Sequence, residues 1–495
     1  MVGNAGVDEY EGGTFTARLE VEFRAIRCCI SGRGRILALF RHFPPRLFTY
    51  WRNDLKLQGR SVFRANGAID VRGLALLDQL AFNRIASFTM PSLFPSTATA
   101  DSRRLITTRA LRGIGDGAVS VLLPSYLSAI GLSPTQIGLI VFATLFGSAL
   151  VTLWAGFATR RIGTRRMFLG ASALMVATGL GFTYVRSFCM LGLVAFVGTM
   201  NPSAGDVSLF LPLEQAAIAQ TVATRELTGV FAIYNVAGAL GGAFGALASG
   251  LPSILAPRFG WNLVAAQRSG FVTYSILGLI AALIYWSLSP AVEAAPTPKK
   301  IAPLAKSRAI VMRLSALFSL DAFGGGFAIQ SLLALWLFRR FNMSVQEAGT
   351  FFFVAGLLGS FSQFISTRLA ERFGRINTMV YTHLPANAFL ILAALMPNET
   401  WAITFLLVRA AMSSMDVPAR QSYVMAVVPP EERAAAASVT NVPRSLASAA
   451  APVPAGMMLD VTSFGWPLIC AGALKIAYDL LLLLQFRAHR PDDEL

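Results

Sequence analysis

The sequence predicts an all-α membrane protein with twelve transmembrane helices in two similar six-helix halves. Composition, a series of apolar segments and an internal repeat support this fold class. Of the 495 residues, 55% are hydrophobic and 14% are charged, and the mean hydropathy is +0.58. Because soluble domains carry roughly 25% charged residues, most of this chain is expected to lie in lipid.

Twelve apolar segments follow one another along most of the chain. They are expected near residues 106–130, 135–158, 167–186, 188–212, 226–251, 269–289, 309–336, 345–367, 377–396, 400–427, 433–458 and 465–486. Each reaches the roughly 20 residues that a helix needs to cross a bilayer. Lipid offers no hydrogen bonds to the backbone, which favours helices. The alternation over about 10 residues that is typical of membrane β-strands does not occur in the sequence.

The loops between these segments differ in charge. One set carries Arg160, Arg161, Arg165, Arg166, Lys299, Lys300, Lys306, Arg308, Arg368, Arg372, Arg375 and Arg433, and the other carries only Arg186, Arg258, Arg268, Arg339 and Arg340. Basic loops stay in the cytoplasm, so both termini are predicted there and the chain in the inner (plasma) membrane. The net charge of +16 lies in short clusters between apolar runs, which argues against a nucleic-acid partner.

The chain divides into unlike parts. Residues 1–104 are rich in Arg and contain no segment long enough to span, so we expect a poorly ordered N-terminal extension, with Met90 as an alternative translation start. The further divisions are 105–289 for the first six-helix half, 290–308 for a cytoplasmic linker, 309–487 for the second half and 488–495 for a cytoplasmic tail.

An internal repeat relates the two halves. GLSPTQIG at 131–138 aligns with NMSVQEAG at 342–349. Further matches keep the same order along the chain and pair Arg161 with Arg372, Asp206 with Asp416, Asn235 with Asn441 and Gly250 with Gly456. Two parallel repeats joined by a charged linker are typical of transporters in which the halves rock against each other.

The loop after the second segment carries a recognisable motif. GFATRRIGTRR at 156–166 resembles the major facilitator superfamily signature Gly-x-x-x-Asp-Arg-x-Gly-Arg-Arg, with Gly156, Arg161, Gly163, Arg165 and Arg166 in place and Arg160 where the family has Asp. The second copy, at 367–377, retains Glu371, Arg372 and Gly374. The resemblance covers about 105–487 and implies a transporter of the bacterial efflux or permease type. In that family the acid helps to latch the halves, so the latch is expected to be asymmetric here.

Acidic residues inside the predicted spans are candidates for proton coupling. A charge at the bilayer centre costs about 2.5–3.5 kcal/mol on insertion scales, so each needs a partner or an aqueous path. The candidates are Asp206, Asp116, Asp321 and Glu214. Asp206 ranks first because Pro202 and Pro212 interrupt its helix, although it could instead pair with Arg112. Arg112 and Asp116 are four residues apart and could equally form a pair of their own.

Other polar residues in the spans are candidates for solute binding or for a gate. Those expected to line a substrate cavity are Arg112, Asn201, Asn235, Gln330, Asn441 and Arg409. Asp416 and Arg420 are four apart and predict a cytoplasmic gate or a structural pair. A hydrogen-bonded role is predicted for His383, and packing or snorkelling for Lys475 and Asp479. The small residues of 237–250 and 445–456 predict sliding contacts between the halves.

No catalytic signature points to an enzyme. The four cysteines and three histidines lack metal-ligand spacing, and no phosphate-binding or dinucleotide motif is present, so neither a metal nor a cofactor is expected. The resemblance implies a monomeric secondary transporter of a small organic solute, with protons as coupling ion and efflux favoured. The alternatives are an uptake symporter and a non-transporting receptor or scaffold on the same fold. The sequence does not disclose the solute.

Overall fold

The computed structural model describes residues 99–203, 208–222, 226–293, 304–305, 307–429 and 431–486. All of them belong to one compact unit, Ser92–Leu495. Within these ranges the regular elements are helices, and no strand is present. The predicted extension 1–104 lies outside the described residues except for its last six, and so does the tail 488–495.

The N-terminal half contains eight α-helices and a short 3-10 helix. They are α4 (Ala100–Ala129), α5 (Pro134–Ile162), α6 (Thr164–Tyr184), α7 (Phe188–Val197), α8 (Phe210–Thr221), α9 (Leu227–Ala248), α10 (Leu251–Phe259), α11 (Leu263–Trp286) and η3 (Pro290–Glu293). The C-terminal half contains α12 (Arg308–Gly326), α13 (Gln330–Phe341), α14 (Val345–Phe373), α15 (Arg375–Leu395), α16 (Glu399–Ser413), α17 (Asp416–Ala426), α18 (Arg433–Ala450), α19 (Pro452–Val461) and α20 (Trp466–Phe486).

Eight of the predicted spans coincide with single helices, and four are interrupted. The interrupted spans are 188–212 (α7 and α8), 309–336 (α12 and α13), 400–427 (α16 and α17) and 433–458 (α18 and α19). In the described part of the chain, seven helical stretches are long and apolar enough to cross a membrane by composition alone. Helices α4 and α14, with 30 and 29 residues, are also long enough to span.

The repeat is visible in the backbone. Gly163 separates α5 from α6 with φ of 91°, and Gly374 separates α14 from α15 with φ of 82°. A positive φ is readily adopted only by glycine, which explains both glycines of the loop motif. Ser133 caps α5 through a reciprocal bond with Gln136, and Ser344 bonds Glu347 in the same way at the start of α14.

Glycines bring α4 and α9 close together within the N-terminal half. An added Cβ at Gly117 would lie 2.0 Å from the carbonyl oxygen of Gly242, and one at Gly245 would lie 2.0 Å from that of Ile114. Helix α12 packs on α18 in the C-terminal half at the equivalent place, with Gly326 against Ser448. The small-residue segments predicted to slide between the halves therefore also pack tightly inside their own half.

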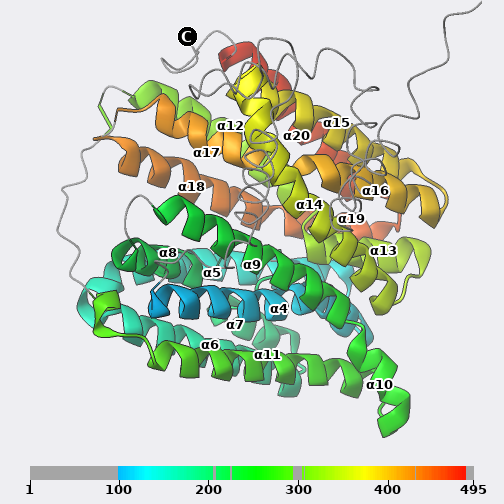
Figure 1. Cartoon of the computed structure of the whole chain (residues 1–495). Helices are drawn as coiled ribbons and strands as arrows, with labels where there is room; N and C mark the ends of the chain where they lie inside the picture. The colour runs from blue at the N-terminus through cyan, green and yellow to red at the C-terminus, as the bar shows by residue number, and fades with distance from the viewer. Residues whose placement is uncertain are drawn as a thin grey trace, which may run out of the picture. The chain divides into compact units, whose positions relative to one another are not determined.

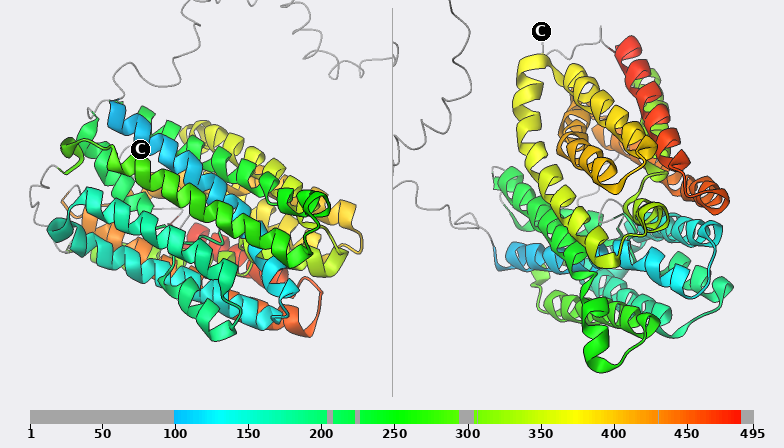
Figure 2. Two further views of the ribbon diagram at one scale, coloured as in Figure 1. Left: turned by 90° about the horizontal axis from the view of Figure 1, so that it is seen from below. Right: turned by 90° about the vertical axis from the view of Figure 1, so that its right-hand side faces the viewer.

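The two halves form two groups of helices that touch each other. Figure 1 shows the N-terminal half in blue to green and the C-terminal half in light green to red, and the right-hand view of Figure 2 shows the same division. Helix α9 packs on α14, and α5 packs on α18 and α19. At Gly138 an added Cβ would lie 2.4 Å from the Pro452 carbonyl oxygen, and Thr135 donates a hydrogen bond of 2.6 Å to Asp460. These two contacts lie near the start of α5, at the opposite end from Gly163.

Candidate functional site

A buried acid in the N-terminal half is held by four side chains. Glu214 on α8 pairs with Arg112 of α4 and accepts hydrogen bonds of 2.8 Å from Thr108, 2.5 Å from Tyr234 and 2.6 Å from Tyr285. Each carboxylate oxygen receives two of these four contacts, so the acceptor capacity of Glu214 is filled. This N-half cluster joins α4, α8, α9 and α11 and is closed to solvent.

The cluster corrects one prediction about Arg112. The guanidinium group lies 4.1 Å from the centre of the Phe210 ring and bonds Glu214, and no ion pair joins it to Asp116. A spacing of four residues put Arg112 and Asp116 on one helix face, but the carboxylate on α8 competes successfully for the arginine. Arg112 therefore stabilises helix packing in this structure and does not line the described cavities.

Asp116 differs from Glu214 in its surroundings. Its side chain is 4% exposed, and among the described residues it has no hydrogen-bond or ion-pair partner. One turn before Arg112, Arg109 is also buried, and its Nε and Nη1 make no hydrogen bond. Asp206, the first-ranked proton candidate, lies outside the described residues.

The C-terminal half contains a larger charged network, the C-half cluster. Asp321 on α12 accepts hydrogen bonds of 2.6 Å from Lys475 on α20 and 3.2 Å from Arg420 on α17. Arg420 also bonds Asp416 at 3.2 Å, which confirms the predicted pair of residues four apart. Lys475 is 8% exposed and bonds Asp321, so of the two roles predicted for it, packing or snorkelling, the structure shows packing.

A histidine extends this cluster behind the ion pairs. His383 Nδ1 lies 2.9 Å from Asp479 Oδ1, and Asn387 donates a hydrogen bond of 3.0 Å to the other oxygen of Asp479. The other ring nitrogen of His383 lies 3.9 Å from Asp321. The hydrogen-bonded role predicted for His383 is confirmed, and the ring links Asp479 on α20 to Asp321 on α12.

A cavity of about 480 Å³ adjoins the C-half cluster. Its polar lining comprises Ser203, Asp321, Gln330, Gln363, Arg409, Ser413, Ser414, Asp416, Arg420, Arg444, Ser445, Ser448 and Lys475. Gln330 and Arg409, two of the predicted cavity residues, are therefore brought together here. Asp416 and Arg420, predicted as a cytoplasmic gate or pair, line the same cavity. We call this space the C-half cavity.

Three other predicted cavity residues lie elsewhere. Asn201 is buried at the interruption between α7 and α8, where its Oδ1 accepts hydrogen bonds from the backbone and hydroxyl of Ser203. Asn235 on α9 and Asn441 on α18 are exposed, and neither belongs to the described lining of the C-half cavity.

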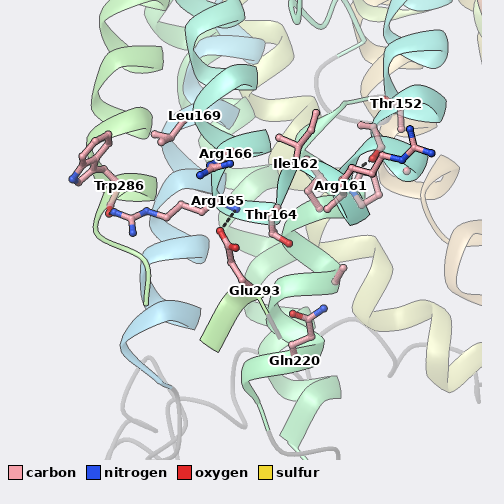
Figure 3. A pocket seen from close by; sticks show the side chains of 17 residues that line it. Thr152, Arg161, Ile162, Thr164, Arg165, Arg166, Leu169, Gln220, Trp286 and Glu293 are labelled. Carbon is pink, nitrogen blue, oxygen red and sulfur yellow. Dashed lines mark hydrogen bonds between the residues drawn. The ribbon is translucent and has the colours of Figure 1, made fainter. Parts of the chain in front are cut away.

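The first signature loop, residues 156–166, is contacted by an acid from a later part of the chain. The backbone N–H of Arg165 donates to Glu293 at 3.3 Å, and its guanidinium donates to the Trp286 carbonyl oxygen (Figure 3). Glu293 lies on η3, at the start of the predicted linker. The carboxylate that Arg160 cannot provide is therefore supplied to this loop by Glu293.

The remaining signature residues surround a broad pocket or face solvent. The pocket, of about 1220 Å³, is lined by Gly156, Arg161, Gly163, Arg165 and Arg166 together with Glu293 and residues of α8 (Figure 3). Arg372 of the second copy is exposed, whereas the side chain of Glu371 lies outside the part of the structure that is described. Whether Glu371 forms the second latch stays a prediction.

The family profile described as Major Facilitator Superfamily matches residues 105–452, most of the described chain. The chain belongs to the major facilitator superfamily. It is thus a multi-pass membrane protein with the fold of secondary transporters. Two relatives are each 25% identical to it: the "Uncharacterized membrane protein YJR124C" of Saccharomyces cerevisiae, over 79% of this chain and 94% of that one, and the "Multidrug efflux protein YfmO" of Bacillus subtilis, over 76% and 90%.

Solved structures of the superfamily share this fold. The nucleoside transporter NupG matches 79% of this chain and 100% of its own, with a TM-score of 0.59 and 13% identity. The D-xylose-proton symporter matches 77% of this chain and 96% of its own, with a TM-score of 0.61 and 16% identity. At such low identity these likenesses concern the fold alone.

Sequence analysis missed several residues of these sites. Tyr234 and Tyr285 complete the shell of Glu214, and Arg444 and Gln363 line the C-half cavity. Each is a polar side chain inside an apolar helix, which is a usable signal, but their partners lie on other helices. Glu293 looked like an ordinary linker charge because its partner precedes it by 128 residues.

Proposed function

We propose that this chain is a proton-coupled exporter that moves a small organic solute by alternating access. The observation that carries the proposal is the C-half cavity, about 480 Å³ in volume and bordered by buried ionised side chains. Charges within a membrane are costly and are retained where they face a solute path or one another. A cavity of this volume suits a metabolite-sized or drug-sized molecule.

Alternating access is supported by the way the halves meet. Small residues on α5 and α19, such as Gly138 and Gly456, bring backbones from the two halves into contact. Gly349 on α14 lies equally close to Ala246 on α9. Close backbone contacts at such small residues let the halves rock with little repacking.

The coupling proton has candidates in both halves. Asp116 is buried without a partner among the described residues, so a proton could be taken up there without breaking an ion pair. Asp321 holds Lys475 and Arg420, and its protonation would weaken both bonds and change the charge of the cavity. Asp206 remains in the proposal on sequence grounds. Glu214 ranks last because four donors already occupy it.

The direction of transport is inferred from a relative, and the location from the charges of the loops. The relative from Bacillus subtilis is named a multidrug efflux protein, which favours export over uptake. The distribution of basic loops supports an inner-membrane protein with both termini in the cytoplasm, and we propose that it acts as a monomer.

The test uses the purified full chain in liposomes that enclose a pH-sensitive dye. A pH gradient is imposed, and a panel of labelled organic solutes is tested for movement coupled to proton flux. We expect gradient-dependent movement of at least one solute, reduced by Asp116→Asn, Asp206→Asn or Asp321→Asn. Glu399→Gln, in the first turn of α16 and outside the lining of the described cavities, is the matched control. Unchanged coupling in all three variants would overturn the proton assignment, and no solute movement would favour a receptor or scaffold.

Cells that express the chain decide the direction of transport. An exporter lowers the cellular content of the solute that moves in liposomes, and it does so less when the proton gradient is collapsed. A solute content that rises instead would replace export by uptake.

A further inference from the structure

We infer that the transported solute is an amphipathic organic anion whose carboxylate binds Arg409 beside the N-terminus of α13. This inference rests on the proposed transport function and names the class of its solute. Three independent features of the C-half cavity support it: the balance of charges, the end of a broken helix and an apolar wall.

The charges that line the cavity are unequal. Its described lining contains two acids, Asp321 and Asp416, and four bases, Arg409, Arg420, Arg444 and Lys475. Lys475 and Arg420 are bound to the two acids at 2.6 and 3.2 Å. These ion pairs occupy both acids of the described lining, so none of its acids is paired with Arg409.

Arg409 is the base whose state points most directly to a ligand. It projects from α16, and its Nε is buried without a hydrogen-bond partner. Within the described ranges no acid or carbonyl group bonds this side chain. The side chain is half-buried and lines the cavity, and a carboxylate matches the geometry of a guanidinium group through two parallel hydrogen bonds. An anionic solute would supply the missing acceptor.

The break between α12 and α13 directs a second positive element at the same space. Ala328, Ile329 and Gln330 line the cavity where α13 begins. The N-terminus of a helix carries a partial positive charge, and broken transporter helices use such ends to bind anionic groups. In α13 the backbone N–H of Ser331 is bonded to the carbonyl oxygen of Pro202 at 3.2 Å, so the helix charge and the remaining N–H groups are what a ligand would meet.

Part of the cavity wall is apolar. Leu333, Leu406, Phe351 and Phe352 contribute to it, and the two phenylalanine rings lie 4.8 Å apart, edge to face. Such a wall buries a hydrocarbon or aromatic body while the carboxylate engages Arg409. A highly hydrated solute such as a free sugar would leave this wall unused.

The test compares three probes of the same shape, namely 4-phenylbutyrate, its amide and 4-phenylbutylamine. Thermal stabilisation of the purified full chain in detergent reports their binding. We expect the carboxylate to bind best, and Arg409→Gln to weaken it about tenfold or more, because a charge-assisted hydrogen bond is lost. Arg409→Lys should restore part of the affinity. Arg258→Gln, at the end of α10 away from the cavity, should bind like the unaltered chain.

Equal binding of the amine or the amide would overturn the inference, and so would an unaltered preference in Arg409→Gln or no binding of any probe. The same probes in the liposome assay distinguish a failure of the anion site from a failure of the proposed transport function. Movement of neutral or cationic solutes alone would leave the transporter standing and remove the anion site. Selective carboxylate binding without movement would keep the site and remove the transporter.

Discussion

The two halves share a fold but use their buried charges differently. In the N-half cluster a base on the first helix, Arg112, meets an acid on the fourth span, Glu214. In the C-half cluster the signs are reversed, because the first helix carries Asp321 and the fourth span carries Arg420. Tyrosines and a threonine close the first pair, whereas the second lines a cavity.

This difference indicates a division of work. A pair enclosed by hydrogen-bond donors fixes the relative positions of its helices and has no capacity left for a ligand. A pair beside a cavity can exchange partners with a solute or a proton. We therefore assign anchoring to the N-half cluster and solute recognition to the C-half cavity.

The largest expected difference in the free energy of unfolding is between variants of Arg112 and of Arg409. Arg112→Ala leaves Glu214 buried without its cation and should lower the free energy of unfolding by about 3–5 kcal/mol. Arg409→Ala, which removes a base without a described partner, should change it by less than about 1 kcal/mol. Thermal unfolding of both variants in detergent measures this. Equal losses would refute the assignment of anchoring to one half.

Helix packing should show the next largest effect. A Cβ at Gly117 would lie 2.0 Å from the backbone oxygen of Gly242, whereas at Gly325 in α12 the nearest atom is Lys475 Cε at 3.4 Å. Gly117→Ala should therefore destabilise the chain by about 1–3 kcal/mol, and Gly325→Ala should be nearly neutral. The same unfolding assay compares them, and a neutral Gly117→Ala would argue against the close α4–α9 contact.

A double-mutant cycle sharpens the comparison of the ion pairs. Asp321→Asn and Lys475→Met, alone and together, should give a coupling free energy of about 1 kcal/mol, because Arg420 also holds Asp321. The equivalent cycle on Arg112 and Glu214 should give more. A larger coupling in the C-terminal half would mean that Asp321 and Lys475 are too tightly bound to respond to a solute.

The smallest expected effect concerns the helix caps before α5 and α14. The hydroxyl of Ser344 donates to the carboxylate of Glu347 and accepts from the backbone N–H of Glu347. The hydroxyl of Ser133 makes one such bond, from the backbone N–H of Gln136.

Ser344→Ala should therefore lower the free energy of unfolding by about 0.5–1 kcal/mol, and Ser133→Ala should lower it by less, because only one hydroxyl bond is lost there. Melting temperatures in detergent measure both changes. A larger loss in Ser133→Ala would show that the two caps do not differ in this way.

Much of the fold could be predicted because it depends on local pattern. The lengths of the apolar segments predicted where the helices lie. The glycines of the loop motif predicted the turns at Gly163 and Gly374, where φ is positive. The pair of Asp416 and Arg420 was also predictable, because spacing within one helix fixes a shared face.

The partners of the buried charges could not be predicted in the same way. Tyr285 lies 71 residues after Glu214, and Lys475 lies 154 residues after Asp321. Which helices meet, and how each is rotated about its axis, depends on packing over the whole fold. For that reason sequence spacing suggested a pair of Arg112 and Asp116, whereas in the structure Arg112 pairs with Glu214 on α8.

The bond between Glu293 and the first signature loop affects how this protein can be recombined with its relatives. A chimera of two related transporters can be joined in the peptide that connects two membrane helices. In this chain a junction placed before residue 290 would replace Glu293, whose carboxylate bonds the loop 156–166. Arg160 in that loop is basic and cannot take its place. A functional chimera should therefore inherit Glu293 together with the first six spans.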